Sequence, residues 1–238
     1  MPALLGFLIA VAVGLTGTGA GSVAAPALMV FLGVPPAQAV GTALLFGAAI
    51  KLAAVPAYIV RRQVNFRVAA LMLAGGLPGA VVGSLLLRAF DARAALGLVI
   101  VAAAALNVYR ALRAPALRPR PRLGWLPWIA LPIGAEVGFS SAGAGALGSL
   151  ALMGFTHLAP AEVVGTDLCF GLGLSLASGG IHFSMGNYDA HLLAQLIGGG
   201  IAGVITGVLL SGRIPARILR VALSLWLAVL GLELCWAG

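Results

Sequence analysis

Charged side chains are scarce in this chain of 238 residues, and their scarcity indicates its environment. Only 8% of the residues are charged, and the chain holds six acids and a single lysine, while 61% of the residues are hydrophobic. A soluble domain carries about 25% charged residues. Because this chain cannot cover a surface in water, we expect an all-α polytopic membrane protein of the cell (plasma or inner) membrane, surrounded by lipid bilayer.

Several function classes are disfavoured by what else is missing. The two cysteines, Cys169 and Cys235, are too few for a disulfide framework. The chain has no His-Glu-x-x-His sequence, no phosphate-binding P-loop and no cluster of metal ligands. Its net charge of +8 comes almost wholly from arginines in short loops, without the interleaved aromatic residues typical of nucleic-acid binding. We therefore expect no enzyme activity, no cofactor, no metal and no nucleic-acid partner.

Long apolar runs, by contrast, are abundant. Each is close to the ~20 residues that a helix needs to cross a bilayer. They lie at 38–59, 68–87, 94–112, 161–183, 191–211 and 216–236.

The chain is a tandem repeat. Residues 14–83 align with residues 138–207 at a constant offset of 124, without a gap and with 23 identities in 70 positions. Val40-Gly41-Thr42 recurs as Val164-Gly165-Thr166. A repeat within a hydrophobic chain is typical of membrane transporters, which bind their substrate where the two halves meet.

Two apolar stretches, 3–32 and 125–156, are each interrupted by glycine-rich segments, at 14–21 and 138–145. The flanks of each break are short, at about 16–22 Å of helix, against a hydrocarbon core of ~30 Å. We therefore expect each stretch to form a broken-helix, re-entrant hairpin with the glycines at its tip. Each repeat then consists of one hairpin plus about three transmembrane helices.

The arginines favour one topology over another. Parallel halves would split them 8 to 5 between the two membrane faces, whereas inverted halves split them 11 to 2, as the positive-inside rule requires. The sequence therefore predicts two inverted repeats with both termini outside. The predicted organisation is a first repeat at 1–112, an Arg/Pro-rich cytoplasmic linker at 113–124 and a second repeat at 125–238.

Glycines recur every fourth residue at 75, 79 and 83, and again at 199, 203 and 207. Such small residues let neighbouring helices approach closely. The stripes can pack within one subunit, or they can form the seam of a homodimer.

These motifs together resemble a known family. A glycine-rich break, a proline, a span that starts with Ala39-Val40-Gly41-Thr42, and a polar loop such as Gly186-Asn187-Tyr188-Asp189 follow one another in two halves. This pattern resembles the TauE/SafE sulfite-exporter family over about 6–232. The resemblance implies transport of sulfur-containing anions such as sulfite, thiosulfate or an organosulfonate. The chain departs from the family pattern at Ala24-Ala25, Gly148-Ser149 and 61–65.

A buried anion site is expected at the hairpin tips. Helix N-termini offer free N–H groups and the positive end of the dipole, and glycine allows close backbone approach. An alternative is that these residues only ease packing and satisfy freed backbone groups. The candidate substrate-binding residues at the tips are Thr16, Thr18, Gly19, Gly21, Ser22, Ser140, Ser141, Gly143 and Gly145.

Three further residues are candidates for the same substrate site. Thr42 and Thr166 occupy equivalent positions near the starts of two spans, where they can face the substrate or bond to their own helix backbone. Lys51 is the only lysine and lies inside a predicted span. It can pair with an anion, or its ammonium can snorkel toward the arginine-rich face.

Two acids are candidates for coupling to a proton or a sodium ion. Asp167 follows Thr166 directly and can instead cap its own helix, and Glu136 can instead pair with an arginine. His182 and His157 lie near span ends, where we expect residues of the membrane interface.

Four functions remain open from the sequence. The first is a secondary transporter of a small sulfur-containing anion that works by alternating access. The others are a transporter of another solute, such as a carboxylate or a metal ion, a membrane-embedded enzyme, and a non-transporting assembly factor.

Overall fold

The computed structural model describes residues 1–16, 20–89, 96–99, 101, 102, 105, 122–141, 145–210, 225, 228, 229, 233 and 236. Regular structure in these residues is helical, and no strand occurs among them. The helices are α1 (Pro2–Thr16), α2 (Ala20–Leu32), α3 (Pro36–Val60), α4 (Phe66–Ala89), the 3₁₀ helix η1 (Leu123–Trp125), α6 (Leu126–Ser140), α7 (Ala146–Phe155), α8 (Pro160–Ser184) and α9 (Ala190–Leu210).

Four of these helices are long and apolar enough to cross a membrane: Pro36–Val60, Phe66–Leu87, Pro160–Ser184 and Ala190–Gly207. They confirm four of the six predicted spans. The other two, at 94–112 and 216–236, fall largely outside the described residues. The linker at 113–124 does so as well, apart from its last three residues.

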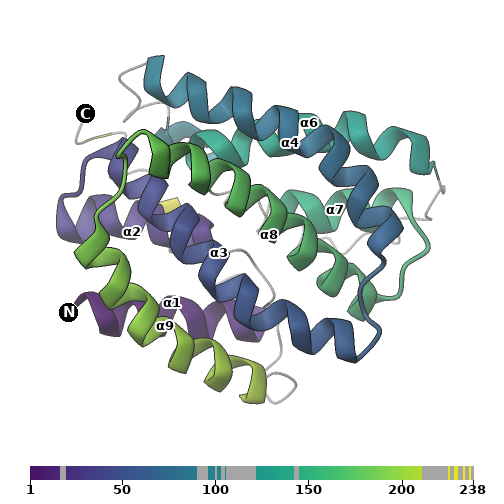
Figure 1. The fold of residues 1–238 in the computed structure, drawn as a ribbon, viewed down its shortest axis with the longest axis horizontal. Helices are drawn as coiled ribbons and strands as arrows, with labels where there is room; N and C mark the ends of the chain where they lie inside the picture. The colour runs from purple at the N-terminus through teal and green to yellow at the C-terminus, as the bar shows by residue number, and fades with distance from the viewer. Residues whose placement is uncertain are drawn as a thin grey trace.

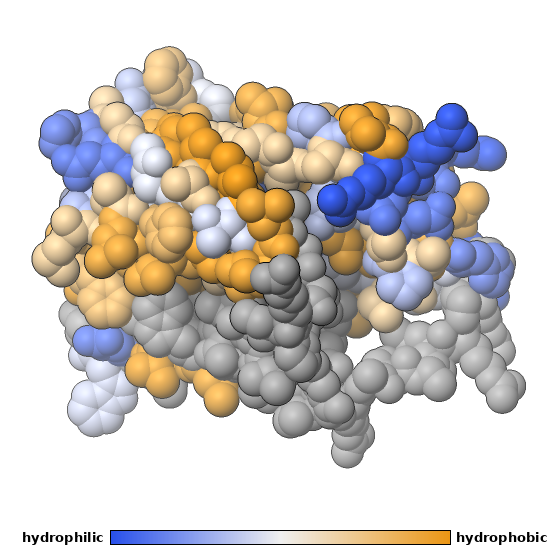
Figure 2. Space-filling model, turned by 90° about the horizontal axis from the view of Figure 1, so that it is seen from below, coloured by the Kyte–Doolittle hydropathy of each residue, from blue (hydrophilic) through white to orange (hydrophobic). Residues whose placement is uncertain are grey.

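The described surface also suits a bilayer. Large apolar side chains on the spans are exposed, among them Leu52, Val82, Leu176 and Ile205. In Figure 2, hydrophobic residues cover much of the visible described surface, and hydrophilic residues gather toward its two ends. A bilayer solvates such an apolar surface, whereas water does not.

Both broken stretches are interrupted where the sequence predicts. The first changes from α1 to α2 across residues 17–19, which lie outside the description. In the second, α6 ends at Ser140, and Ser141 has a left-handed φ of 61°. Gly145 precedes α7 with a φ of 104°, which a glycine adopts without steric cost. The stretch is therefore two helices, one ending at Ser140 and the other starting at Ala146.

Helices α3 and α8 are equivalent across the repeat, and they run antiparallel side by side through the centre of the molecule (Figure 1). Gly41 near the start of α3 packs on the backbone of Asn187, just beyond the end of α8. Gly165 near the start of α8 packs in the same way on Gln63, just beyond the end of α3. These two contacts are therefore equivalent in the two halves of the sequence repeat.

The two halves exchange packing partners. The glycine stripe of α4 packs on α6 of the second half, because a Cβ on Gly79 would lie 2.0 Å from the Leu131 carbonyl oxygen. The stripe of α9 packs on α1 of the first half, with a Cβ on Gly203 2.3 Å from the Phe7 carbonyl oxygen. Figure 1 shows these two pairs on opposite sides of α3 and α8. Both stripes are thus used within one chain, and a homodimer remains a prediction.

Side chains cap the starts of α4 and α9, the helices that follow α3 and α8 in the chain. The Asn65 side chain accepts the N–H of Val68 at the start of α4. Its repeat equivalent, Asp189, accepts the N–H of Leu192 at the start of α9. Both are N-cap interactions, which stabilise a helix start by satisfying a free backbone donor.

Candidate functional site

The centre of the α3–α8 pair holds Lys51, whose side chain is only 2% exposed. Its Nζ donates to the Ser175 hydroxyl at 2.7 Å and to the Gly171 carbonyl oxygen at 3.3 Å. Lys51 and Ser175 are separated by 124 residues, the offset of the repeat. Each is the repeat equivalent of the other, so equivalent positions of the two halves meet at this point.

A buried ammonium is costly unless other groups compensate for its lost hydration. The two oxygen acceptors do so in part, and the carboxylate of Asp167 attracts Lys51 electrostatically. Lys51 therefore lies in a polar site inside the bundle and does not snorkel to the surface. A charge kept inside a membrane bundle is functional in most proteins.

Asp167 connects this site to the second hairpin. Its Oδ2 accepts a hydrogen bond from Ser149 of α7 at 2.7 Å. A Cβ on Gly148 would lie 2.0 Å from Asp167 Oδ1, so only glycine fits at that position without a shift. The carboxylate thus contacts the first turn of α7, where the helix dipole favours negative charge. A role in coupling stays a prediction.

Thr42 and Thr166 are fully buried and make equivalent contacts across the repeat. The Thr42 hydroxyl accepts the N–H of Asp189 at 3.1 Å, and the Thr166 hydroxyl accepts the N–H of Asn65 at 3.0 Å. Each threonine therefore ties one half to the loop of the other. They lie at opposite ends of the α3–α8 pair, and a contact with substrate remains a prediction for each.

The second hairpin tip contains a separate polar group. Ser140 is buried and donates to Glu136 Oε1 at 2.6 Å within α6, and Ser141, the next residue, is 2% exposed. Glu136 is thus bonded to a serine of its own helix, and its coupling role is untested.

The remaining tip candidates are placed only in part. Thr16 ends α1, and Gly21 and Ser22 lie in the first turn of α2. Thr18, Gly19 and Gly143 lie outside the described residues.

Sequence reasoning missed two serines that bond to the charged groups of Lys51 and Asp167. The sequence assigned no role to Ser175, and Ser149 stood out only as a departure from the family pattern. The offset of 124 could have identified Ser175, because a residue on a two-fold axis contacts its own equivalent. No sequence signal pairs Ser149 with Asp167, since their contact depends on how α7 packs.

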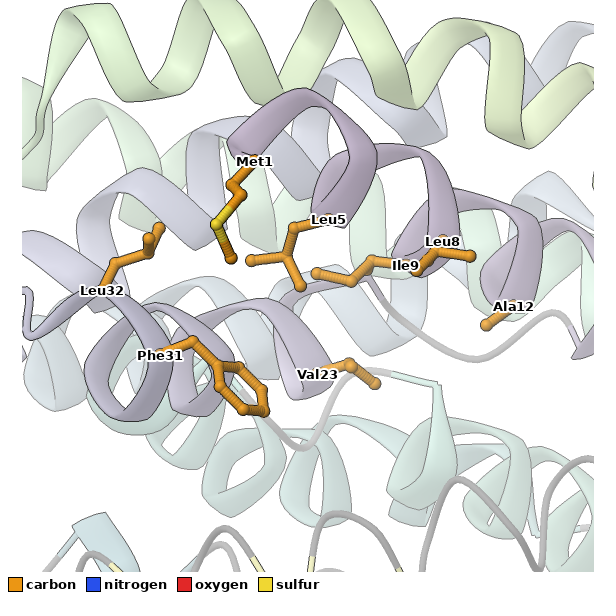
Figure 3. A pocket seen from close by; sticks show the side chains of 8 residues that line it. All are labelled: Met1, Leu5, Leu8, Ile9, Ala12, Val23, Phe31 and Leu32. Carbon is orange, nitrogen blue, oxygen red and sulfur yellow. The ribbon is translucent and has the colours of Figure 1, made fainter.

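An apolar cavity of about 470 Å³ lies apart from this polar site, between α1 and α2. Figure 3 shows Met1 and Leu5 opposite Leu32 and Phe31, so the two helices run back along each other as a hairpin. The cavity is lined only by apolar side chains. Such a lining offers no hydrogen bond to an anion, and the polar site around Lys51 is the better candidate for one.

Apolar helices that can cross a membrane, arranged as two repeats around a buried polar centre, are typical of polytopic membrane transporters. The comparisons with known proteins agree. The family described as "Sulfite exporter TauE/SafE" matches residues 3–234. The chain is 31% identical to the "Probable membrane transporter protein YjnA" of Bacillus subtilis (strain 168), over 97% of each protein. No solved structure matches the chain.

The chain therefore belongs to the sulfite exporter TauE/SafE family of membrane transporters.

Proposed function

We propose that this chain is a secondary transporter, rather than an enzyme, that binds a small sulfur-containing anion beside Lys51 at the interface of the repeats. The observation that supports this most is the ammonium held by Ser175 and Gly171 where equivalent positions of the two halves meet. An ammonium has three N–H donors. Two are used by these contacts, and the third can donate to an oxygen of the solute.

The charge of Lys51 supports an anion over a metal ion as the solute, because a buried ammonium repels a cation. A carboxylate would satisfy the same donor and is the main competitor. Family membership supports sulfite, thiosulfate or an organosulfonate over a carboxylate. In this proposal the hairpin tips add backbone N–H groups from the starts of α2 and α7, as anion sites at helix N-termini do.

Alternating access between inverted halves is the mechanism we propose. Its support is the antiparallel course of α3 and α8, because equivalent helices that run in opposite directions are expected when one half is inverted relative to the other. The arginine-rich loops would then face the cytoplasm, with both termini outside. Asp167 and Glu136 are the acids that we propose for coupling to a proton or a sodium ion.

The direct test is ligand-induced stabilisation of the purified protein in detergent. The ligands are sulfite, thiosulfate, sulfoacetate, taurine, an aryl sulfonate, acetate, phosphate and chloride. A ligand at 100 times its Kd should add about 2.7 kcal/mol to the free energy of unfolding. Stabilisation by a sulfur oxyanion, but not by acetate or chloride, is the expected result. Stabilisation by acetate alone would assign a carboxylate transporter, and no response at all would favour an assembly role.

A further inference from the structure

One face of α8 is polar over most of its length, and this face is buried, although other residues of the helix such as Leu176 are exposed. Asp167, Gly171, Ser175, Ser178 and His182 follow one another at intervals of three or four residues and so share a face. All five are buried. The face extends for about 22 Å along the helix axis, which is most of the ~30 Å thickness of a hydrocarbon core.

The first repeat has no such face. The equivalent positions on α3 are Ala43, Gly47, Lys51, Ala54 and Tyr58. Lys51 is thus the single charged group that α3 contributes, and it points at the middle of the polar face, where it bonds to Ser175. The two helices thus differ in polarity although they occupy equivalent positions in the two repeats.

At the C-terminal end of this face, some polar side-chain atoms lack a partner at hydrogen-bond distance and angle. The Ser178 hydroxyl and both ring nitrogens of His182 have no such partner among the described residues, although the His182 ring approaches the Gly138 carbonyl. Their side chains are 0% and 1% exposed. Buried polar groups are nearly always hydrogen-bonded, and an unpaired group costs about 1–3 kcal/mol. A buried group of this kind calls for a specific role or for a partner from outside the chain, such as a water molecule or an ion.

We propose that Ser178 and His182 form a second binding station for the transported anion, and that the anion moves between this station and Lys51 along the polar face of α8. The inference rests on the proposed function and adds a path to it. The serine hydroxyl and the imidazole N–H are both donors suited to an oxyanion. The station lies about 4–10 Å along α8 from Ser175. The path therefore follows the second repeat, with Lys51 as the contribution of the first.

Cysteine accessibility tests the asymmetry with a matched pair. Ser178→Cys and Ala54→Cys occupy equivalent positions of the repeat, and both sites are buried, with Ala54 7% exposed. Each is made in the full chain with Cys169→Ser and Cys235→Ser, reconstituted into lipid vesicles. The reagents are sulfonatoethyl methanethiosulfonate, which is anionic, and its trimethylammonium analogue, which is cationic. The rate of thiol modification is measured by mass spectrometry.

We expect the anionic reagent to modify Ser178→Cys at least ten times faster than Ala54→Cys, and faster than the cationic reagent does. Equal rates at the two positions would overturn the proposal, because the path would then be symmetric. Modification at neither position would overturn it as well. The cysteine-free parent, assayed for transport of sulfite, separates this outcome from failure of the proposed function.

A second variant keeps the test independent of thiol chemistry. Ser178→Ala introduces the residue that the first repeat carries at this position, and it leaves Lys51 in place. We expect the KM for the anion to rise roughly tenfold, as loss of a hydrogen bond to a charged group predicts. An unchanged KM in protein that remains monodisperse would show that Ser178 only packs.

Discussion

At the scale of single residues, a few polar groups connect the two halves of the repeat. Lys51 and Ser175 meet at the centre of the α3–α8 pair, and the Thr42 and Thr166 hydroxyls accept backbone N–H groups near its two ends. The central contact carries the charge that we assign to binding. The terminal contacts are neutral and hold the halves together. These two roles predict different consequences of substitution.

Lys51→Met keeps much of the volume of the side chain and removes its charge. We expect stabilisation by sulfur oxyanions to disappear, because the variant has no ammonium to pair with the anion. The measurement is the shift in Tm of the purified variant with each ligand. Arg67→Gln is the control, since Arg67 is an exposed cation at the start of α4 whose loss should leave the shift unchanged.

Thr42→Val and Thr166→Val should each destabilise the fold by roughly 1–3 kcal/mol, because each leaves a loop N–H without its acceptor. The two effects should be similar, since the contacts are equivalent. Thr206→Val is the matched control, because among the described residues the Thr206 hydroxyl bonds to the Ala202 carbonyl of its own helix. Denaturant unfolding of the three variants measures the difference. A large loss of stability in Thr206→Val, with none in Thr42→Val and Thr166→Val, would contradict a role of the two buried threonines in holding the halves together.

At the scale of elements, the glycine stripes explain why the halves cannot be separated. Helix α9 packs on α1 and helix α4 packs on α6, so each half covers the first helix of the other. The contacts are between backbones, which only glycine permits at such close approach. A side chain at a stripe position must therefore push two helices apart.

Gly199→Ala tests this packing against a neighbour on the same helix. A Cβ on Gly199 would lie 1.8 Å from the Ala3 carbonyl oxygen, whereas a Cβ on Gly198 meets nothing within 4 Å. We expect Gly199→Ala to lower the Tm sharply. Gly198→Ala should leave it unchanged or raise it, since alanine favours helix over glycine by about 1 kcal/mol. Equal effects of both variants would show that the stripe does not pack as described.

Much at this scale could be predicted from the sequence, because apolar run length and glycine spacing are local signals. The spans at 38–59 and 161–183 appear as α3 and α8 with nearly the same ends. The packing of α4 on α6 and of α9 on α1 could not be predicted. The glycine stripes indicate that helices approach closely, but they do not indicate which helix packs against each stripe. The buried face of α8 was missed for a similar reason. Serines and a histidine within a span fit structural roles equally well until neighbouring atoms are known.

At the scale of the whole molecule, the topology that we propose rests on the directions of two equivalent helices. Helices α3 and α8 are repeat equivalents that run in opposite directions. If both cross the bilayer, one half is inverted relative to the other, and the arginine-rich loops collect on one face. Lys51 lies near the middle of α3, far from both ends of the helix. This is where a transporter of two inverted halves is expected to hold its substrate.

Reporter fusions test this topology. We expect alkaline phosphatase fused to the C-terminus to be active and green fluorescent protein at the same place to be dark, because the inverted arrangement puts both termini outside. Fusions after Arg61 should give the reverse pattern. A fluorescent C-terminal fusion would contradict the inverted arrangement with outer termini.

We propose that the buried ammonium of Lys51 binds a transported sulfur-containing anion. Uptake of radiolabelled sulfite, thiosulfate and sulfoacetate by lipid vesicles containing the wild-type chain, Lys51→Met or Arg67→Gln tests this proposal. We predict uptake of at least one of these anions by the wild type and by Arg67→Gln, and a loss of about tenfold or more with Lys51→Met, as expected for a charge-assisted hydrogen bond. Uptake by Lys51→Met at the wild-type rate would contradict the account.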